Sequence, residues 1–252
     1  MQAPRQAAPA GIVPFKATSS TNLQAQPCTE NIPGQTGVPV CHRWYDPASF
    51  NIAYDATNVA PGSNTGIAIF TEGDPTIAIS DFRYNEQQYG LPTIPVNRID
   101  VEAPSSDTSG NGEWTLDMYA TSTMAWQPHH LDLYNVAGLQ FSELVKAFNA
   151  WANDDKDPVM NASVGGCEVF PYQSGDMLVG DMVLVEAAAQ GQTLFASTGD
   201  TGAYCGVDGV PPNGGVGGAP LVEYPASSPY ATAVGGTDLF TNVDGTYLGE
   251  DA

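Results

Sequence analysis

The stretch DMLVGDMVLVEAAAQGQTLFASTGDTG, residues 176–202, decides the predicted fold. Residues 176–190 have an apolar middle of helical length, and residues 193–197 form a short apolar run that ends in a glycine-rich turn. The first pattern predicts a helix and the second predicts a buried strand. A helix followed directly by a buried strand is the repeating unit of α/β proteins. The stretch therefore predicts an α/β fold.

The same alternation extends in both directions from this stretch. Further strands are expected at residues 66–70, 96–101, 131–136, 159–164 and 231–234. Helices are expected at residues 46–54, 77–89, 113–126 and 141–152. Unbroken apolar strands that alternate with helices predict a parallel sheet with helices on both faces and right-handed crossovers. Ligand chemistry in such sheets gathers where loops leave the carboxyl ends of the strands.

The N-terminal part of the chain has a different composition. Residues 1–43 are predicted to be an irregular leader or linker, and residues 44–252 to be one domain. Residues 1–23 are rich in Ala, Pro, Thr and Ser without an apolar run, which is not the pattern of an intact signal peptide. No apolar stretch approaches the roughly 18 residues that a membrane span requires.

The charge of the chain is one-sided, with 28 acidic residues against 7 basic residues and a formal net charge of −21. Such a surface repels phosphate backbones and anionic lipids, so nucleic acid and membrane surfaces are excluded as expected partners. Two explanations of the acidity stay open. One is solubility, and the other is function at low pH, where carboxylates are partly protonated and repel one another less.

Four cysteines, Cys28, Cys41, Cys167 and Cys205, allow three pairings. The local pairing Cys28–Cys41 would close a short loop and leave Cys167–Cys205. Free buried thiols are the main alternative, because no pair has the C-x₂₋₄-C spacing of a metal site. The even cysteine count, the scarcity of lysine and the many Gly and Pro residues favour a secreted protein.

Two carboxylates, Glu113 and Asp117, stand one helical turn apart, so they project from one face. Ala120 and Met124 continue that face, which predicts that it points inward, and residues 101–145 contain no Lys or Arg. Two close, partly desolvated acids cannot both ionise easily, so at least one pKa is expected to rise. That pattern suits a general base below neutral pH. The alternative is a solvated helix N-terminus, where the helix dipole favours acids.

Asp200 stands between Gly199 and Gly202, directly after the strand expected at residues 193–197. An acid here can direct its carboxyl group over the carboxyl end of the strand. The alternative is an ordinary turn aspartate that bonds its own backbone. No lysine lies near these glycines, which excludes a G-x-x-x-x-G-K-[ST] phosphate loop.

Together these segments resemble the sedolisin family, the serine-carboxyl peptidases. Glu113-x-x-x-Asp117 resembles the family's Glu and Asp, and NASVGGCE (161–168) is similar to its Ser-x-Gly-Gly-x-Glu strand end. AAAQGQTLFASTGDTGA (187–203) is close to the family's Ala-x-x-Gly-x-Thr-x-x-x-Ser-x-Gly-Asp-x-Gly-Ala block. PASSPYATAVGGT (225–237) then follows in the expected order. The resemblance runs from about Trp44 to Gly249.

The resemblance implies a subtilisin-like α/β fold and a serine-type endopeptidase that acts on proteins or peptides at acidic pH. Glu113 would take the proton from a serine hydroxyl, as histidine does in Ser-His-Asp enzymes. Asp117 would orient Glu113 and hold its proton. Asp200, when protonated, would donate a hydrogen bond to the tetrahedral oxyanion. No metal ligand is expected among these site residues.

The sequence also departs from the family pattern. The family's nucleophile lies in a Gly-Thr-Ser-x-x-x-Pro segment, but here Gly236-Thr237 is followed by Asp238. No nucleophile is therefore assigned, and the chain is expected to be a C-terminally incomplete peptidase domain, inactive as given. Calcium is expected for the family, but its binding loop is not in this chain.

Two other functions are alternatives to the peptidase. A non-catalytic secreted module with a peptidase-like fold, which binds peptides, is the main alternative. The spacing disfavours a glycosidase that uses Glu113 and Asp117, because acids one helical turn apart lie on the same side of a substrate, whereas glycoside hydrolysis needs them on either side of the bond.

Overall fold

The computed structural model describes residues 30–31, 39–40, 47–103, 105–200, 202, 221–242 and 244–251. The chain divides into two compact units. The larger unit spans Ala60–Asp238 together with Ala252, and the smaller unit combines Met1–Val59 with Leu239–Asp251. The domain boundary expected near residue 43 stays a prediction.

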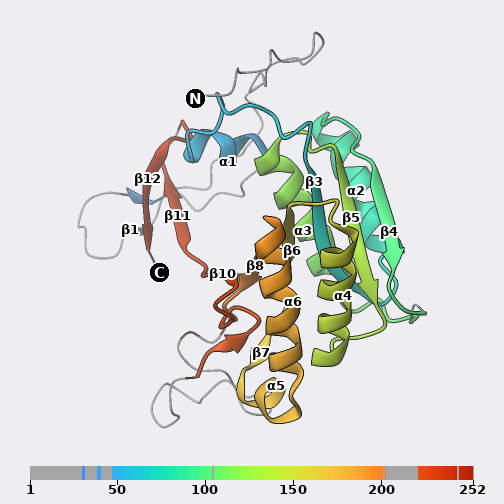
Figure 1. The fold of residues 1–252 in the computed structure, drawn as a ribbon. Coiled ribbons are helices and arrows are strands. Elements are labelled where there is room, and N and C mark those ends of the chain that lie inside the picture. Colours follow the sequence, from blue (N-terminus) through green and yellow to red (C-terminus); the bar gives the residue numbers. More distant parts are fainter. Residues whose placement is uncertain are drawn as a thin grey trace, which may run out of the picture. The chain divides into compact units, whose positions relative to one another are not determined.

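A six-stranded sheet forms the centre of the larger unit (Figure 1). Its strands are β3 (Gly66–Glu72), β4 (Val96–Asp100), β5 (His130–Val136), β6 (Val159–Ala162), β8 (Thr193–Ser197) and β10 (Ala231–Val234). They lie in the order β10-β8-β6-β3-β5-β4, with β10 and β4 at the edges. Neighbouring strands of this sheet pair in parallel, which confirms the predicted parallel sheet.

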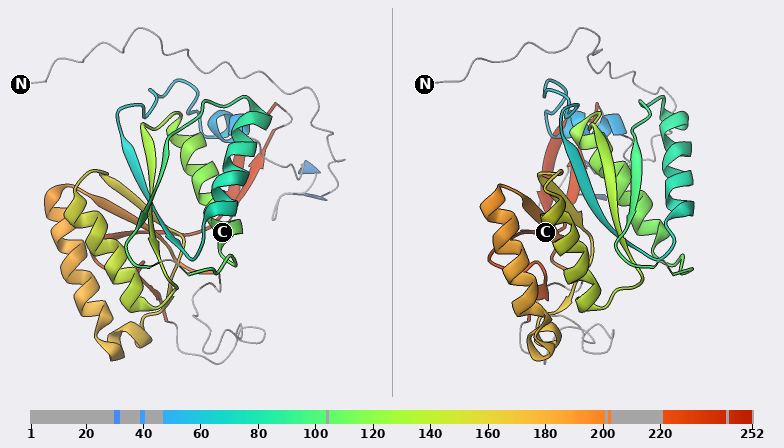
Figure 2. Two further views of the ribbon diagram at one scale, coloured as in Figure 1. Left: turned by 90° about the vertical axis from the view of Figure 1, so that its right-hand side faces the viewer. Right: turned by 45° about the vertical axis from the view of Figure 1, so that its right-hand side comes forward.

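Helices cover both faces of this sheet, as the alternation predicts. Figure 2 shows α2 (Thr76–Tyr89) with α3 (Asn111–Ala125) on one face and α4 (Phe141–Asp154) with α6 (Asp176–Gln190) on the other. The largest fully buried side chains, among them Trp151, Phe148 and Met160, fill the layers between helices and strands. None of the described helices is long and apolar enough to cross a membrane.

The two connections through α2 and α3 have opposite hands. The chain passes from β3 out to the edge strand β4 through α2, and returns from β4 to β5 through α3. The two helices pack together, with the Tyr89 and Tyr119 ring centroids 6.2 Å apart, on the same face of the sheet (Figure 2). Crossovers that run in opposite directions over one face cannot both be right-handed. The expectation of right-handed crossovers throughout is therefore wrong for one of them.

Several short elements carry too little periodicity to be expected from sequence. In the larger unit these are α5 (Val169–Ser174) and the antiparallel pair β7 (Gly166–Cys167) and β9 (Glu223–Tyr224). In the smaller unit, by contrast, α1 (Pro47–Ala53) confirms the helix predicted at residues 46–54. The strands β1 (Glu30–Asn31), β2 (Pro39–Val40) and β12 (Tyr247–Asp251) were not expected, nor was β11 (Asp238–Thr241), which begins at the boundary between the units.

Candidate active site

The side chain of Asn111 anchors the first turn of α3 at the carboxyl edge of the sheet. Its Oδ1 accepts a hydrogen bond from the backbone N of Ala78 at 2.8 Å. Its Nδ2 donates to the backbone O of Asp74 and of Thr108, each at 3.0 Å. Asp74 follows the end of β3 at Glu72. The helix that carries Glu113 and Asp117 therefore starts where the central strand ends.

Asp117 is buried at this edge, with 6% of its surface exposed. Its Oδ1 accepts a hydrogen bond of 2.6 Å from the Oγ of Ser163, which directly follows β6. The Nδ2 of Asn161 in turn lies 3.3 Å from this Oγ and donates to it. The second oxygen, Oδ2, is buried and has no hydrogen-bond partner among the described residues. The Oδ1 of Asp117 is thus held by residues at the end of β6, whereas its Oδ2 can still form a hydrogen bond.

Burial raises the pKa of Asp117 from its usual 3.8 to about 6. The negative charge of Glu113 raises this pKa further, whereas the hydrogen bonds from Ser163 and Asn161 oppose the increase. A carboxylate in a poorly hydrated place loses solvation energy, so its neutral form is favoured. Below about pH 6 the group therefore carries a proton that it can donate to a neighbouring acid.

The Ser163→Ala substitution is expected to raise the pKa of Asp117 above about 6. A hydrogen bond to a charged group contributes about 1.5–3 kcal/mol, and its loss removes the larger of the two hydrogen-bond contributions that oppose the effect of burial. The ¹³C carboxyl shift of Asp117, followed by NMR through a pH titration, measures the change. Ser122→Ala is the control, because Ser122 lies on α3 and bonds only the backbone O of Tyr119 in the described contacts. An unchanged midpoint in Ser163→Ala would contradict the role of this hydrogen bond.

Glu113 lies one turn earlier on the same helix and is exposed. The expectation that the whole stripe faces inward is correct for Asp117 but wrong for Ala120 and Met124, which are exposed. Successive residues of a helix turn by about 100°, so an i, i+4 stripe drifts around the axis. The buried face of α3 runs instead through Asn111, Trp114, Asp117, Met118, Ser122 and Thr123. A solvent-accessible acid therefore stands next to an enclosed one.

Asp200 lies at the same edge of the sheet. It follows the end of β8 at Ser197, and β8 pairs in parallel with β6 in a register that sets Ala196 beside Ala162. Ser163 and Asp200 thus both lie beyond the carboxyl ends of neighbouring strands. The structure brings Glu113 and Asp117 together with Ser163, and it places the exposed Asp200 on the same rim rather than on the opposite side.

Glu223 of β9 is the neighbour that sequence reasoning missed. Burial raises its pKa, and the charge of Asp200 raises it further. Its side chain lies against Gly199, where a Cβ atom would come within 2.4 Å of the Glu223 Cδ. Gly199 also has φ +90°, so glycine is required there on both grounds. No local signal links Glu223 to Asp200, because antiparallel pairing with β7 brings β9 to this place.

Ser163 and Asn161 were also missed as functional residues. Both lie in the segment quoted for the resemblance, and the Ser of the Ser-x-Gly-Gly pattern was the available signal. The same segment leads into Cys167, which is disulfide-bonded. The other three cysteines lie outside the described residues, so the pairing Cys167–Cys205 stays a prediction.

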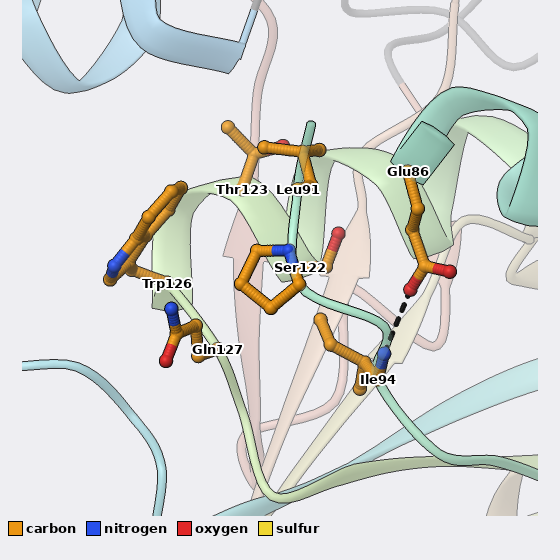
Figure 3. Close-up of a pocket in the computed structure, with 8 residues that line it drawn as sticks. Glu86, Leu91, Ile94, Ser122, Thr123, Trp126 and Gln127 are labelled. Carbon is orange, nitrogen blue, oxygen red and sulfur yellow. Dashed lines mark hydrogen bonds between the residues drawn. The ribbon is translucent and has the colours of Figure 1, made fainter. Parts of the chain in front are cut away.

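A separate pocket, between α2 and the end of α3, is structural (Figure 3). Its volume of ≈ 10 Å³ is close to the minimum that holds one water molecule. The buried Glu86 at its side accepts a 2.8 Å hydrogen bond from the backbone N of Ile94, drawn dashed in Figure 3, and forms an ion pair with Arg83. This carboxylate is therefore used to hold the loop before β4 and is not a substrate-binding group.

Comparison with known proteins finds similarity to peptidases. Sedolisin from Pseudomonas sp. (strain 101) is 33% identical over 214 residues, and xanthomonalisin from Xanthomonas sp. (strain T-22) is 29% identical over 219 residues. These matches cover 82% and 79% of this chain but only 36% and 26% of the relatives, so the chain spans about a third of their length or less. No family model matches the chain.

The solved structures agree with the sequence comparison. A complex of Pseudomonas sedolisin, a serine-carboxyl proteinase, with two molecules of pseudo-iodotyrostatin matches with a TM-score of 0.75 and 32% identity. The match covers 82% of this chain and 57% of that one. A lanthipeptide protease structure, 16% identical with a TM-score of 0.50 over 74% of this chain, shows likeness of fold alone. The expected subtilisin-like α/β fold is thus confirmed.

Proposed function

Because this chain belongs to the sedolisin family, with a match that covers 82% of its residues, we propose that it is part of a serine-carboxyl endopeptidase that cleaves proteins or peptides at acidic pH. The observation that carries the proposal is the buried Asp117, whose pKa is about 6, one helical turn from the exposed Glu113. An acid pair of this kind can hold a proton below neutral pH and pass it to a reacting group.

The proposed roles follow from accessibility. Glu113, open to solvent, accepts the proton of a serine hydroxyl as that oxygen attacks the peptide carbonyl. Asp117, protonated and held from behind by Ser163, donates a hydrogen bond to Glu113 and keeps it oriented. Asp200 in its protonated form donates a hydrogen bond to the oxyanion of the tetrahedral intermediate. The neighbouring acid Glu223 interacts electrostatically with Asp200. An aspartate can donate only when neutral, which ties this step to acid pH.

Two parts of the family pattern are not assigned to residues of this chain. The nucleophile is expected in a Gly-Thr-Ser-x-x-x-Pro segment beyond Ala252, so residues 1–252 by themselves are proposed to be inactive. The expected calcium is proposed to bind a loop beyond the same point, and no step above uses it. In the acidic turn between β11 and β12, Asp244 Oδ1 accepts hydrogen bonds from the N and Oγ1 of Thr246, so this oxygen holds the turn together.

We further propose that the protein is secreted. Disulfides persist in oxidising compartments outside the cytosol, and Cys167 is disulfide-bonded. The net charge of −21 keeps such a protein soluble when part of its carboxylates are protonated.

Asp200→Ala in the natural full-length protein tests the proposed reaction. Loss of one oxyanion donor is expected to lower kcat on denatured casein at acid pH by about 10²–10³-fold, with a smaller change in KM. Asp200→Asn is expected to lose less, because its amide still donates. Asp81→Asn, an exposed acid on α2, is the control.

Two results would contradict the proposal. If the Asp200→Ala variant kept the activity of the unmodified protein, Asp200 would not be the oxyanion donor. A full-length protein that binds denatured casein without cleaving it at any pH from acid to neutral would favour the non-catalytic peptide-binding module.

A further inference from the structure

A second group of ionisable side chains lies at the opposite rim of the sheet, where the strands begin. His130 is the first residue of β5, Asp132 lies two residues further along the strand, and Asp157 directly precedes the segment that enters β6. One ligand atom of each lies within 4.8 Å of the others. Because the strands are parallel, this cluster and the candidate active site are at opposite ends of the sheet.

The cluster is enclosed and carries more acid than base. Asp132 is 4% exposed and Asp157 is 0% exposed. The Nε2 of His130 lies 2.8 Å from Asp157 Oδ1 and 3.7 Å from Asp132 Oδ2. One imidazolium can offset one of the two carboxylates. The Oδ2 of Asp157 is buried without a hydrogen-bond partner among the described residues, so this oxygen is open to a further ligand.

Neighbouring groups hold each of the three side chains in place. Asn97 Nδ2 donates to Asp132 Oδ1 at 2.7 Å, which leaves Oδ2 facing His130. The Nδ1 of His129 lies 2.7 Å from the Nδ1 of His130 and fixes the imidazole from its far side. When a metal ion takes the place of the Nε2 proton and His130 keeps its proton on Nδ1, the lone pair of Nε2 faces Asp157 and Asp132. Such outer hydrogen bonds orient the ligands in protein metal sites.

The backbone around Asp157 is equally fixed. Its carbonyl O accepts hydrogen bonds from Trp151 Nε1 at 2.8 Å and Gln192 Nε2 at 3.2 Å. Gly66 lies directly against the site and has to be a glycine, because a Cβ atom there would lie 2.1 Å from Asp157 Oδ1 and 2.2 Å from His130 Nε2. The glycine lets the three ligands approach the start of the central strand.

From this geometry we propose that His130, Asp132 and Asp157 bind a divalent transition-metal ion, with zinc as the best-suited ion. One imidazole nitrogen and two carboxylate oxygens supply three ligands of a tetrahedral zinc site, and water completes it. Calcium and magnesium prefer sets made of oxygen alone. The ion would balance the excess of carboxylates and link the first residue of β5 to the loop before β6.

Zinc titration of the full chain tests the site directly. After removal of metals with EDTA, calorimetry with ZnCl₂ near neutral pH is expected to give one site of micromolar or tighter affinity. His130→Gln and Asp157→Asn are each expected to lose at least about 100-fold in affinity, and His129→Gln about 10-fold with the stoichiometry kept. Asp155→Asn, an exposed acid two residues from Asp157, is the matched control and is expected to bind as the unmodified chain does.

Thermal unfolding gives a second readout that does not depend on the variants. Zinc in excess is expected to raise the Tm of the unmodified chain, because a ligand that binds only the folded state stabilises it. Co²⁺ is expected to give absorption of a tetrahedral nitrogen–oxygen site. No binding and no Tm shift in the unmodified chain would show an ion pair without metal and overturn the proposal. Equal zinc affinity in folded His130→Gln would place the ion elsewhere and overturn it as well.

Discussion

Glu113→Gln in the natural full-length protein is expected to lower kcat on denatured casein by about 10²–10⁴-fold, the usual contribution of a positioned general base. The amide occupies the same volume as the carboxylate but cannot accept the serine proton. Because Glu113 is exposed, the substitution is expected to leave the free energy of unfolding within about 0.5 kcal/mol of its original value. Initial rates at several casein concentrations separate kcat from KM.

Glu186→Gln is the matched control for this experiment, since Glu186 is an exposed acid on α6, on the opposite face of the sheet. It is expected to keep full activity. Glu113→Gln with kcat within a factor of a few of the unmodified protein would show that another group takes the proton.

Asp117→Asn is expected to stabilise the fold at neutral pH while it abolishes activity. The folded-state pKa of about 6 lies above the usual 3.8, so the folded protein binds more protons than the unfolded chain between these values. Stability is therefore highest below about pH 4 and falls as the pH rises to about 6. The difference corresponds to on the order of 3 kcal/mol. Asparagine removes this cost and still accepts the hydrogen bond from Ser163.

Urea unfolding at four pH values between about 4 and about 7 measures this effect. The unmodified chain is expected to lose stability across the range relative to Asp117→Asn, and the two to converge at the acid end. Asp81→Asn, exposed on α2, is expected to follow the unmodified chain throughout. A constant difference between Asp117→Asn and the unmodified chain at all pH values would mean that Asp117 does not titrate in this range.

Sequence patterns predicted the main elements of the larger unit well. The helix at residues 176–190 and the strands at 193–197 and 231–234 have the same bounds in the structure. Each of these segments is a mostly apolar run with glycine close to one or both of its ends, and such runs and their boundaries are local features of the sequence. The acid pair on α3 and the acid after β8 were likewise visible, because spacing and turn residues are local features.

The missing parts of the prediction depend on contacts between distant segments. The burial of Asp117 but not of Ala120 follows from how α3 lies on the sheet, and no residue count gives that angle. Glu223 reaches Asp200 through pairing of β9 with β7, and each of these strands has two residues. The opposite hands of the α2 and α3 connections follow from the strand order, with both helices on one face of the sheet. Propensity and pattern carry no information on any of these.

Strand β6 has four residues, Val159–Ala162. Asp157 lies just before it and Ser163 just after it, while Met160 and Ala162 are fully buried within it. A shift of this strand along its axis would displace the side chains at both rims at once. Mutational scanning should therefore find β6 among the least tolerant segments of the chain, and protein engineering would do better to vary the outward side of α6, where Leu178 and Met182 face solvent.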